Sequence, residues 1–587
     1  MTKSRHALIV ALAAVGGFLT LCDIAAAAAL PPGVDAAAPP VIRTAPGRVA
    51  FSVDGGVVDG QDNAGGGGDP AVALPDGGAV ALYGGELGHS DLVQIKADGT
   101  LDPAFGAGGI EPVPVNLPDF GAGQILRQPD GRLVVVGGQQ SSNAVPFPHV
   151  VLVRLNPDGS LDPSFGAGGV DVTPIQLSCD CSTVGLRPTG GFVVGGATTQ
   201  QAGPNVGNVK TQITQWTLAG LTSSGALDPS FGQAGLVTLA GNRASGLDVR
   251  VLPDGDTVTT GDATLSATRS QGELARLLPS GAPDPSFDGG TLEALPTTPI
   301  PGQILAYPDG TVIVGVDHAI VRYTAAGLPD AGFGTGGIVQ TRPATDVTAG
   351  GQLLPAAGDG ALFLEETGPE YSQGRYTAEL IGPSGAIDPS LGGTDGLAFS
   401  IPFGGGSSNL LATIHPPLAT SLGLAGNTFV GNVVQRPDGS YLFLGGVTVS
   451  QPTGEGTGNS IAEFAAAALT SAFKVDTSFG GAEAPLHAKL AVIRQRATTA
   501  RSKHGIRVTV TLSAPGLARV VIKASGRVVA QNVLPVFGTG PSTLPVELTS
   551  FGNQWLKSHP RSRLTASVTA RGLLANSATS TAAGSLR

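Results

Sequence analysis

The sequence predicts an all-β protein, with a β-propeller of seven blades of about four strands each, followed by a small antiparallel β-sandwich. Three observations predict this fold. Gly and Pro, with 89 and 45 residues, approach a quarter of the 587-residue chain, a composition that is typical of short strands joined by turns and excludes long helices. Two phrases alternate along the chain, each in seven copies. The last hundred residues lose both phrases and alternate apolar with polar positions instead.

The first phrase combines Asp, Phe and glycines. Its copies are LDPAFGAGGI from Leu101, LDPSFGAGGV from Leu161, LDPSFGQAGLV from Leu227, PDPSFDGG from Pro283, LPDAGFGTGGIV from Leu328, IDPSLGGTDG from Ile387 and VDTSFGG from Val475. Their aspartates recur every 62 residues or so on average, at Asp102, Asp162, Asp228, Asp284, Asp330, Asp388 and Asp476. Such a period is the mark of a repeat architecture.

The second phrase places a turn before a short apolar strand. Its copies are LPDGGAVALYGG from Leu74, QPDGRLVVVGG from Gln128, RPTGGFVVGG from Arg187, LPDGDTVTTG from Leu252, YPDGTVIVG from Tyr307, AGDGALFLEE from Ala357 and RPDGSYLFLGG from Arg436. Pro fixes φ, Asp bonds its own backbone and Gly accepts positive φ, so the phrase predicts a turn and then a strand. Further strands, such as those from His149 and Ala319, bring each unit to about four, which matches one blade.

These two phrases resemble the delta-60 repeat family of bacterial β-propellers, over roughly residues 48–482. The chain departs from the pattern at three positions, where Leu391 replaces the Phe, Thr189 replaces the turn Asp, and Gly289 lies one place late. The resemblance implies a propeller in an extracellular setting and brings no established activity. Within residues 48–485, the last blade carries a long insert between Asp438 and Asp476, and a strand near residues 48–53 is a candidate to complete it.

Residues that recur in every unit are expected to build the unit. We expect the Asp to accept hydrogen bonds from its own turn, the Phe to pack between adjacent blades and the glycines to allow a tight turn. Function is then expected where units differ, in the irregular inserts at 197–212, 403–431 and 450–472. These inserts are rich in Gly, Ser and Thr, which also fits plain surface loops.

The N-terminus predicts export. Lys3 and Arg5 precede an apolar run at 7–21 and an alanine tract at 25–29, the order of a secretory signal peptide, so residues 1–29 are assigned to it and 30–47 to a linker. Cys22 loosely resembles a lipoprotein acylation site, but Leu21 stands where a small residue is required. No later stretch reaches the roughly 18 apolar residues of a spanning helix. We expect a monomer that is secreted or associated with the cell envelope, with no transmembrane segment.

Residues 486–587 predict an Ig-like antiparallel sandwich, with strands beginning near Lys489, Ile506, Ala518, Thr543 and Arg563. This region is more basic than the acidic propeller, through residues that include Arg494, Arg496, Arg501, Lys503, Lys557, Arg561 and Arg563. The cations favour an anionic wall polymer or form an ordinary soluble surface. The whole chain has a net charge of -11, which argues against nucleic acid as a partner.

The chain contains no HExxH, no G-x-S-x-G, no phosphate loop with its Lys and no paired CxxC, so we assign no catalytic, cofactor-binding or metal residue. Cys179 and Cys181 form an oxidised or buried pair more readily than a two-ligand metal site. Carboxylates and an amide that crowd one glycine-rich segment fit a calcium loop or a solvated acidic loop, without EF-hand spacing, at Asp54, Asp59, Asp62, Asn63 and Asp69. Glu365 and Glu366 are neighbours on one strand and point to opposite faces.

Two alternative functions follow from these observations on the sequence. The first is a non-catalytic extracellular or cell-envelope repeat protein that acts as a binding or scaffold module for a protein or an envelope polymer. The alternative is a propeller enzyme, a hydrolase or lyase, with a site at the channel mouth built from irregular loops and His89, His149, His318 and His415. We favour the first, because these histidines occupy unmatched positions in the repeats. With only Trp216 and Trp555 for stacking on sugars, the sequence argues against a lectin that binds sugar faces through aromatic side chains.

Overall fold

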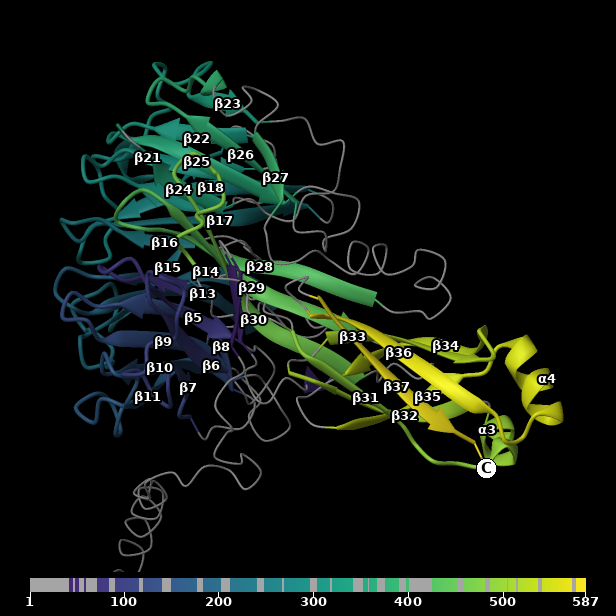
Figure 1. The fold of residues 1–587 in the computed structure, drawn as a ribbon. Coiled ribbons are helices and arrows are strands. Elements are labelled where there is room, and N and C mark those ends of the chain that lie inside the picture. Colours follow the sequence, from purple (N-terminus) through teal and green to yellow (C-terminus); the bar gives the residue numbers. More distant parts are fainter. Residues whose placement is uncertain are drawn as a thin grey trace, which may run out of the picture. The chain divides into compact units, whose positions relative to one another are not determined.

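The structure is a computed structural model. It describes residues 42–45, 48–51, 58–59, 71–83, 90–115, 120–139, 149–176, 183–201, 212–239, 248–266, 269–295, 303–316, 319–341, 352–356, 358–366, 375–389, 397–400, 425–450, 459–480, 486–503, 505–513, 516–536, 541–572 and 577–586. The protein is nearly all-β and has the propeller fold that the sequence predicts, with the strands labelled in Figure 1. The predicted signal peptide, Cys22 and most of the predicted linker lie outside these residues; 42–45, within the stretch expected as linker, form a strand.

Within the described part of 42–469, the strands form seven antiparallel sheets, numbered here in chain order. The first sheet contains β4 (Ala71–Ala73), β5 (Ala79–Tyr83), β6 (Asp91–Ile95) and β7 (Ile110–Pro112). The second contains β8 (Phe120–Arg127), β9 (Leu133–Gln139), β10 (His149–Leu155) and β11 (Val170–Gln176). The third contains β12 (Thr183–Leu186), β13 (Phe192–Gln201), β14 (Gln212–Leu221) and β15 (Leu236–Leu239).

The next three sheets repeat this meander. The fourth contains β16 (Asp248–Val251), β17 (Thr257–Ser266), β18 (Arg269–Leu277) and β19 (Glu293–Ala294), with a short 3-10 helix at Asp288–Gly290. The fifth contains β20 (Ile304–Ala306), β21 (Val312–Val316), β22 (Ala319–Tyr323) and β23 (Ile338–Gln340). The sixth contains β24 (Gln352–Ala356), β25 (Gly360–Glu366), β26 (Arg375–Ile381) and β27 (Leu397–Ser400).

The seventh sheet joins strands from both ends of the array. It contains β28 (Ala425–Gln435), β29 (Tyr441–Ser450) and β30 (Asn459–Leu469), and also β1 (Ile42–Ala45), β2 (Arg48–Phe51) and β3 (Val58–Asp59). β2 pairs antiparallel with β30, Val49 opposite Ala466. The strand considered near residues 48–53 therefore completes the last sheet, because β2 covers the edge of β30 that β29 does not pair with.

Neighbouring sheets pack on one another through shared apolar cores. The first strand of each sheet contacts the first strand of the next, and the cycle returns from β28 to β4. One core combines Val49, Leu442 and Phe464 of the seventh sheet with Ala79 and Val93 of the first, all of them buried. Since burial of apolar side chains is the main favourable term in folding, this core joins the end of the array to its beginning.

The C-terminal residues form two further antiparallel sheets around one core (Figure 1). One sheet contains β31 (Ala488–Val492), β32 (Gly505–Leu512) and β35 (Ser542–Glu547); the other contains β33 (Gly516–Ala524), β34 (Arg527–Val536), β36 (Arg563–Gly572) and β37 (Ser577–Ser585). The five predicted strands are present, and β34 and β37 are additional.

Two helices in the C-terminal region were not expected, α3 (Ala497–Ser502) and α4 (Ser550–Ser558). Thr549 begins α4, because its hydroxyl accepts a hydrogen bond from the backbone N–H of Gly552 at 2.9 Å. Leu556 is buried on the inner side of α4. Neither helix, nor any other helix in the described residues, has the length and apolar character needed to cross a membrane.

Candidate functional site

The repeated Asp builds its own turn, as predicted. One carboxylate oxygen accepts a hydrogen bond from the backbone N–H two residues later, at 2.9–3.0 Å, in six units: the donors are Ala104, Ser164, Ser230, Ser286, Gly332 and Ser478. The backbone N–H of the same Asp donates to the third strand of its sheet, for example from Asp162 to the carbonyl of Arg154 at 2.9 Å. The phrase therefore fixes the chain as it leaves the third strand.

The second carboxylate oxygen is bound by a side chain that the sequence analysis missed. In four units the partner lies eight residues before the Asp: Gln94 with Asp102 at 2.8 Å, Arg154 with Asp162 at 2.8 Å, Arg276 with Asp284 at 2.5 Å and Arg322 with Asp330 at 3.1 Å. The guanidinium also lies over the repeated Phe, with Arg154 4.5 Å from the centre of the Phe165 ring.

In two units the residue eight places before the Asp is Gly220 or Ala468, which cannot supply a cation. There the cation comes instead from the residue that precedes Pro in the second phrase. Arg187 donates to Asp228 at 2.6 Å, and Arg436 forms an ion pair with Asp476 at 3.6 Å. The cation is thus retained at one place in space while its position in the sequence changes.

Four of these five arginines also bind the next sheet. The third strand of each sheet ends in a five-residue turn, called here the third-strand turn, at 96–100, 156–160, 222–226, 278–282, 324–328, 382–386 and 470–474. Arg154 donates to the carbonyl of Ser223 at 2.7 Å, Arg187 to Pro279 at 2.8 Å, Arg322 to Pro383, and Arg436 to Ala97 at 3.3 Å. We call each Arg with its Asp an arginine clamp. The last clamp reaches the first sheet.

The repeated Phe packs between sheets, as predicted. Phe105, Phe165, Phe231, Phe287, Phe333 and Phe479 are all fully buried. The ring of Phe479 would be 3.0 Å from a Cβ at Gly99, a residue with φ +85° in the third-strand turn of the first sheet. Gly480 donates its N–H to Asp98 of the same turn at 2.9 Å, as Gly106 does to Asp158 at 2.8 Å. Glycine is favoured at Gly99, because its positive φ strains other residues and a Cβ would crowd the ring.

Side-chain amides and a carboxylate join the first strands of neighbouring sheets. The side chain of Gln352 accepts from the N–H of Val433 at 2.9 Å and donates to its carbonyl at 2.7 Å. Gln124 accepts from the N–H of Val184 at 2.7 Å, and Asp248 from the N–H of Ile304 at 2.7 Å. These polar groups substitute for a backbone ladder between sheets that do not pair. They are structural, like the clamps.

The pKa shifts of the repeated aspartates agree with a structural role. Two hydrogen bonds from Ser230 and the ion pair with Arg187 lower the pKa of Asp228, although burial acts to raise it. At Asp284, burial acts to raise the pKa, but the bonds from Ser286 and Arg276 outweigh it and lower the pKa. A carboxylate with a lowered pKa is held ionised near neutral pH. These aspartates are therefore stable anions rather than proton donors.

Of the four histidines in the enzyme alternative, His149 lies within the described residues. The ring of His149, on β10, lies 3.0 Å from the carbonyl of Thr173 in the neighbouring strand. His89, His318 and His415 lie outside the described residues, as do Cys179, Cys181 and most of the predicted calcium segment; Asp59 lies on β3. In the part that the structure describes, no three His, Cys, Asp or Glu side chains gather as metal ligands. Glu365 and Glu366 are adjacent on β25.

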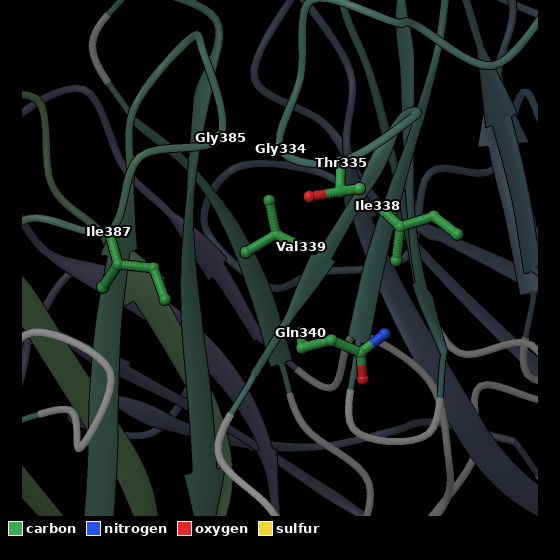
Figure 2. A pocket seen from close by; sticks show the side chains of 7 residues that line it. All are labelled: Gly334, Thr335, Ile338, Val339, Gln340, Gly385 and Ile387. Carbon is green, nitrogen blue, oxygen red and sulfur yellow. The ribbon is translucent and has the colours of Figure 1, made fainter.

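A groove of about 770 Å³ lies between the fifth and sixth sheets (Figure 2). Figure 2 shows Thr335, Ile338 and Gln340 on one side, Ile387 on the other and Val339 between them. Its walls are uncharged, since apolar side chains, glycines, one hydroxyl and one amide line it. A hydrolase needs groups that move protons, and the groove offers none among its lining residues.

The strongest candidate site is a basic pocket of about 820 Å³ in the C-terminal region. Lys523 from the end of β33, Arg561 and Arg563 from the entry to β36, and Trp555 and His559 from α4 and its end line this basic pocket. The rings of Trp555 and His559 stack at 3.9 Å with an angle of 8°. The sequence analysis named Arg561 and Arg563 as cations and Trp555 as an aromatic residue without joining them, and it missed Lys523 and His559.

The remaining predicted cations do not line the basic pocket. Arg494 and Arg496 precede α3, Arg501 lies in α3 and Lys503 follows it. Arg501 donates to the side-chain oxygen of Asn553 in α4 at 3.0 Å. Lys557 is exposed on α4. The structure thus separates the predicted basic residues into a pocket and a dispersed surface.

Comparison with known proteins supports the propeller. A family described as "Domain of unknown function (DUF5122) beta-propeller" matches residues 128–165 and 252–287. Both matches begin at the residue before Pro-Asp-Gly and end at the repeated Phe, so each spans one second phrase and the first phrase that follows it. No curated protein matches the sequence.

Solved structures show only distant likeness. A glucose dehydrogenase is 14% identical with a TM-score of 0.29, covering 69% of this chain and 98% of that chain. A protein of unknown function from Bacteroides caccae is 14% identical with a TM-score of 0.28, covering 52% of this chain and 90% of that chain. An α-L-arabinofuranosidase from Fusarium graminearum is 12% identical with a TM-score of 0.31, covering 54% and 88%. Likeness of this extent carries nothing about activity.

Proposed function

We propose that the protein is a non-catalytic, exported binding module of the cell envelope. The propeller serves as a rigid platform, and the C-terminal region presents a basic surface to an envelope polymer. The observation that carries this proposal is the division of charge along the chain. Residues 486–587 contain fourteen Lys and Arg but one acidic residue, Glu547, whereas the whole chain has a net charge of -11. Opposite charges segregated in one chain favour an anionic partner at the basic part.

The repeats support the platform. Their aspartates and arginines bind each other, their own turns and the next sheet, as in Arg187, Asp228 and the carbonyl of Pro279. Charges used in this way stabilise the array, because an unpaired buried charge is costly. The platform we infer has seven blades, supported by seven sheets, seven copies of each phrase and the cycle of contacts between first strands.

The same proposal has four further parts: export, the cleavage of residues 1–29, the delta-60 relationship, and an Ig-like identity for 486–587. The charged, apolar and small-residue order at the N-terminus supports export. Two packed antiparallel sheets around one core support a sandwich domain. The N-terminal residue of the protein recovered from outside the cytoplasm, read by mass spectrometry, tests this part; a protein that keeps its first thirty residues contradicts it.

Retention on isolated cell envelopes tests the binding function. The full chain is incubated with an envelope fraction of the source cells, and the retained protein is measured as the salt concentration rises. A chain with net negative charge would be repelled by an anionic envelope, so retention at low salt and release at high salt support a local basic contact. No retention at low salt overturns the proposal. Turnover of an envelope substrate by the purified chain would instead establish the enzyme alternative.

A further inference from the structure

Three cations of the basic pocket converge, and no acidic side chain is among the residues that line it. Lys523, Arg561 and Arg563 are exposed and line one concave surface. Glu547, the only acidic residue in 486–587, lies on β35 of the other sheet. Like charges that gather in this way repel one another, and a bound anion relieves that repulsion. Arginine in particular presents paired donors that match carboxylate and phosphate oxygens.

Contacts between aromatic rings line one side of the basic pocket. Trp555 stacks on His559 on one side and lies 5.6 Å from the ring centre of Phe551 on the other. Its indole N–H donates to the hydroxyl of Ser562 at 3.2 Å, and that hydroxyl donates to the carbonyl of His559 at 2.7 Å. Proteins that bind single-stranded nucleic acid use open aromatic faces for base stacking. His559 covers one face of the Trp555 indole, so that face is not open to a base.

A track of hydroxyl groups leads away from the basic pocket. Thr565 pairs with Lys523 across β36 and β33, and the outer face of β36 and β37 continues with Ser567 opposite Thr581 and Thr569 opposite Thr579. The intervening side chains of β36, such as Ala566 and Val568, are buried, which places the hydroxyls on the exposed face. At about 3.3 Å per residue, the track from Thr565 to Thr569 is roughly 13 Å long.

We propose that the basic pocket and this hydroxyl track bind a linear acidic polysaccharide, whose carboxylates pair with Lys523, Arg561 and Arg563 and whose hydroxyls bond to the threonines. The inference rests on the proposed function and names its ligand class. Both halves of the ligand's chemistry are matched, because cations recognise the carboxylates and neutral donor and acceptor groups recognise the sugar hydroxyls. A polymer without hydroxyls would use only the pocket.

The test uses the full chain and three probes at low ionic strength in the absence of calcium: an oligogalacturonate, a neutral dextran and a single-stranded oligonucleotide of equal charge. The wild type is expected to bind the oligogalacturonate, with affinity falling as salt rises, and to leave dextran unbound. Arg561→Ala with Arg563→Ala is expected to weaken binding about tenfold, since each of the two exposed charge-assisted contacts contributes a factor of about three.

Two further variants separate this site from diffuse attraction. Lys489→Ala with Arg507→Ala removes the same charge from exposed positions on the other sheet and is expected to change affinity less than about twofold. Thr565→Val with Thr569→Val is expected to weaken oligogalacturonate binding about threefold and to leave binding of the oligonucleotide unchanged.

Equal losses in the pocket pair and the distant pair overturn the assignment, as does an oligonucleotide that binds as tightly as the oligogalacturonate. Circular dichroism of each variant checks that the fold is intact. If the full chain is retained on envelopes but does not bind oligogalacturonate, the ligand class is wrong and the proposed function stands. If neither binds, both fail.

Discussion

Replacing Asp228 by Asn tests whether an arginine clamp holds neighbouring sheets together. Asp228 uses both carboxylate oxygens, one for the N–H of Ser230 at 3.0 Å and one for Arg187 at 2.6 Å. Asn has one acceptor oxygen, so one of these bonds is lost. The side chains of Arg187 and Asp228 are only 9% and 18% exposed. Removing one partner of a buried pair typically costs 3–5 kcal/mol, and partial exposure places the expected cost at about 3 kcal/mol.

Asp102→Asn is the matched control, because it changes the same position of the repeat where the partner is neutral. Asp102 accepts from Ala104 at 3.0 Å and from the amide of Gln94 at 2.8 Å. Gln94 can turn its amide and accept from the new Asn, whereas Arg has no acceptor to offer. The control is therefore expected to cost about 1 kcal/mol or less.

Urea unfolding followed by tryptophan emission measures both variants. Trp555→Phe removes one of the two tryptophans of the chain, so the signal comes from Trp216. Trp216 is 1% exposed on β14, and Asp228 lies in the connection from β14 to β15. Midpoint shifts are compared in this common background. Equal shifts for the two variants, or a larger shift for Asp102→Asn, would refute the role assigned to the clamp.

Three further predictions concern acid, the links between first strands and the C-terminal helix. The folded pKa of Asp228 is lowered, so its contribution to stability is present above the unfolded pKa of about 4 and is lost as pH falls through the folded pKa. The urea midpoint of the wild type should therefore fall more steeply below pH 4 than that of Asp228→Asn. Parallel curves of midpoint against pH for the two proteins would contradict this. Gln352→Leu leaves the N–H and carbonyl of Val433 without their partner and should cost about 1–3 kcal/mol. Gln352→Glu keeps the acceptor for the N–H but sets a carboxylate oxygen against the carbonyl, so it should also lower the urea midpoint. An unchanged midpoint for Gln352→Leu in the same unfolding assay would count against the bridge. Gly552→Ala places a Cβ 1.8 Å from the carbonyl oxygen of Val529 and should unfold the C-terminal region. Trp555 emission in a Trp216→Phe background measures this unfolding. Native emission from the variant would show that α4 does not approach β34 so closely.

The sequence identified the parts of the propeller that repeat at fixed positions. Asp228 and Phe231 recur with their neighbours in almost every unit, so their roles in the turn and between sheets could be inferred from spacing alone. The arginines could not, because the cation comes from eight residues before the Asp in some units and from the position before Pro in others, as with Arg154 and Arg187. Because either of two positions can supply the arginine, no single position of the repeat shows Arg in every unit.

The C-terminal region was predicted less completely for a different reason. Alternating apolar residues identified its strands, but α4 depends on the cap at Thr549 and on the close approach of Gly552 to β34, which are tertiary features. The basic pocket likewise joins Lys523, Trp555 and Arg561 from three segments. Only their juxtaposition distinguishes them from the exposed cations elsewhere in 486–587.

The pairing of β2 with β30 determines when folding can finish. Its partners, such as Val49 and Ala466, are more than 400 residues apart in sequence, so the pairing has a very high contact order and is expected to form slowly. During synthesis the pair of β1 and β2 emerges first, and the other edge of β2 has no partner until the last repeat is complete. Until then the array has two free edges that can pair with other chains. The final strand pairing is therefore the step at which misassembly between molecules competes with folding.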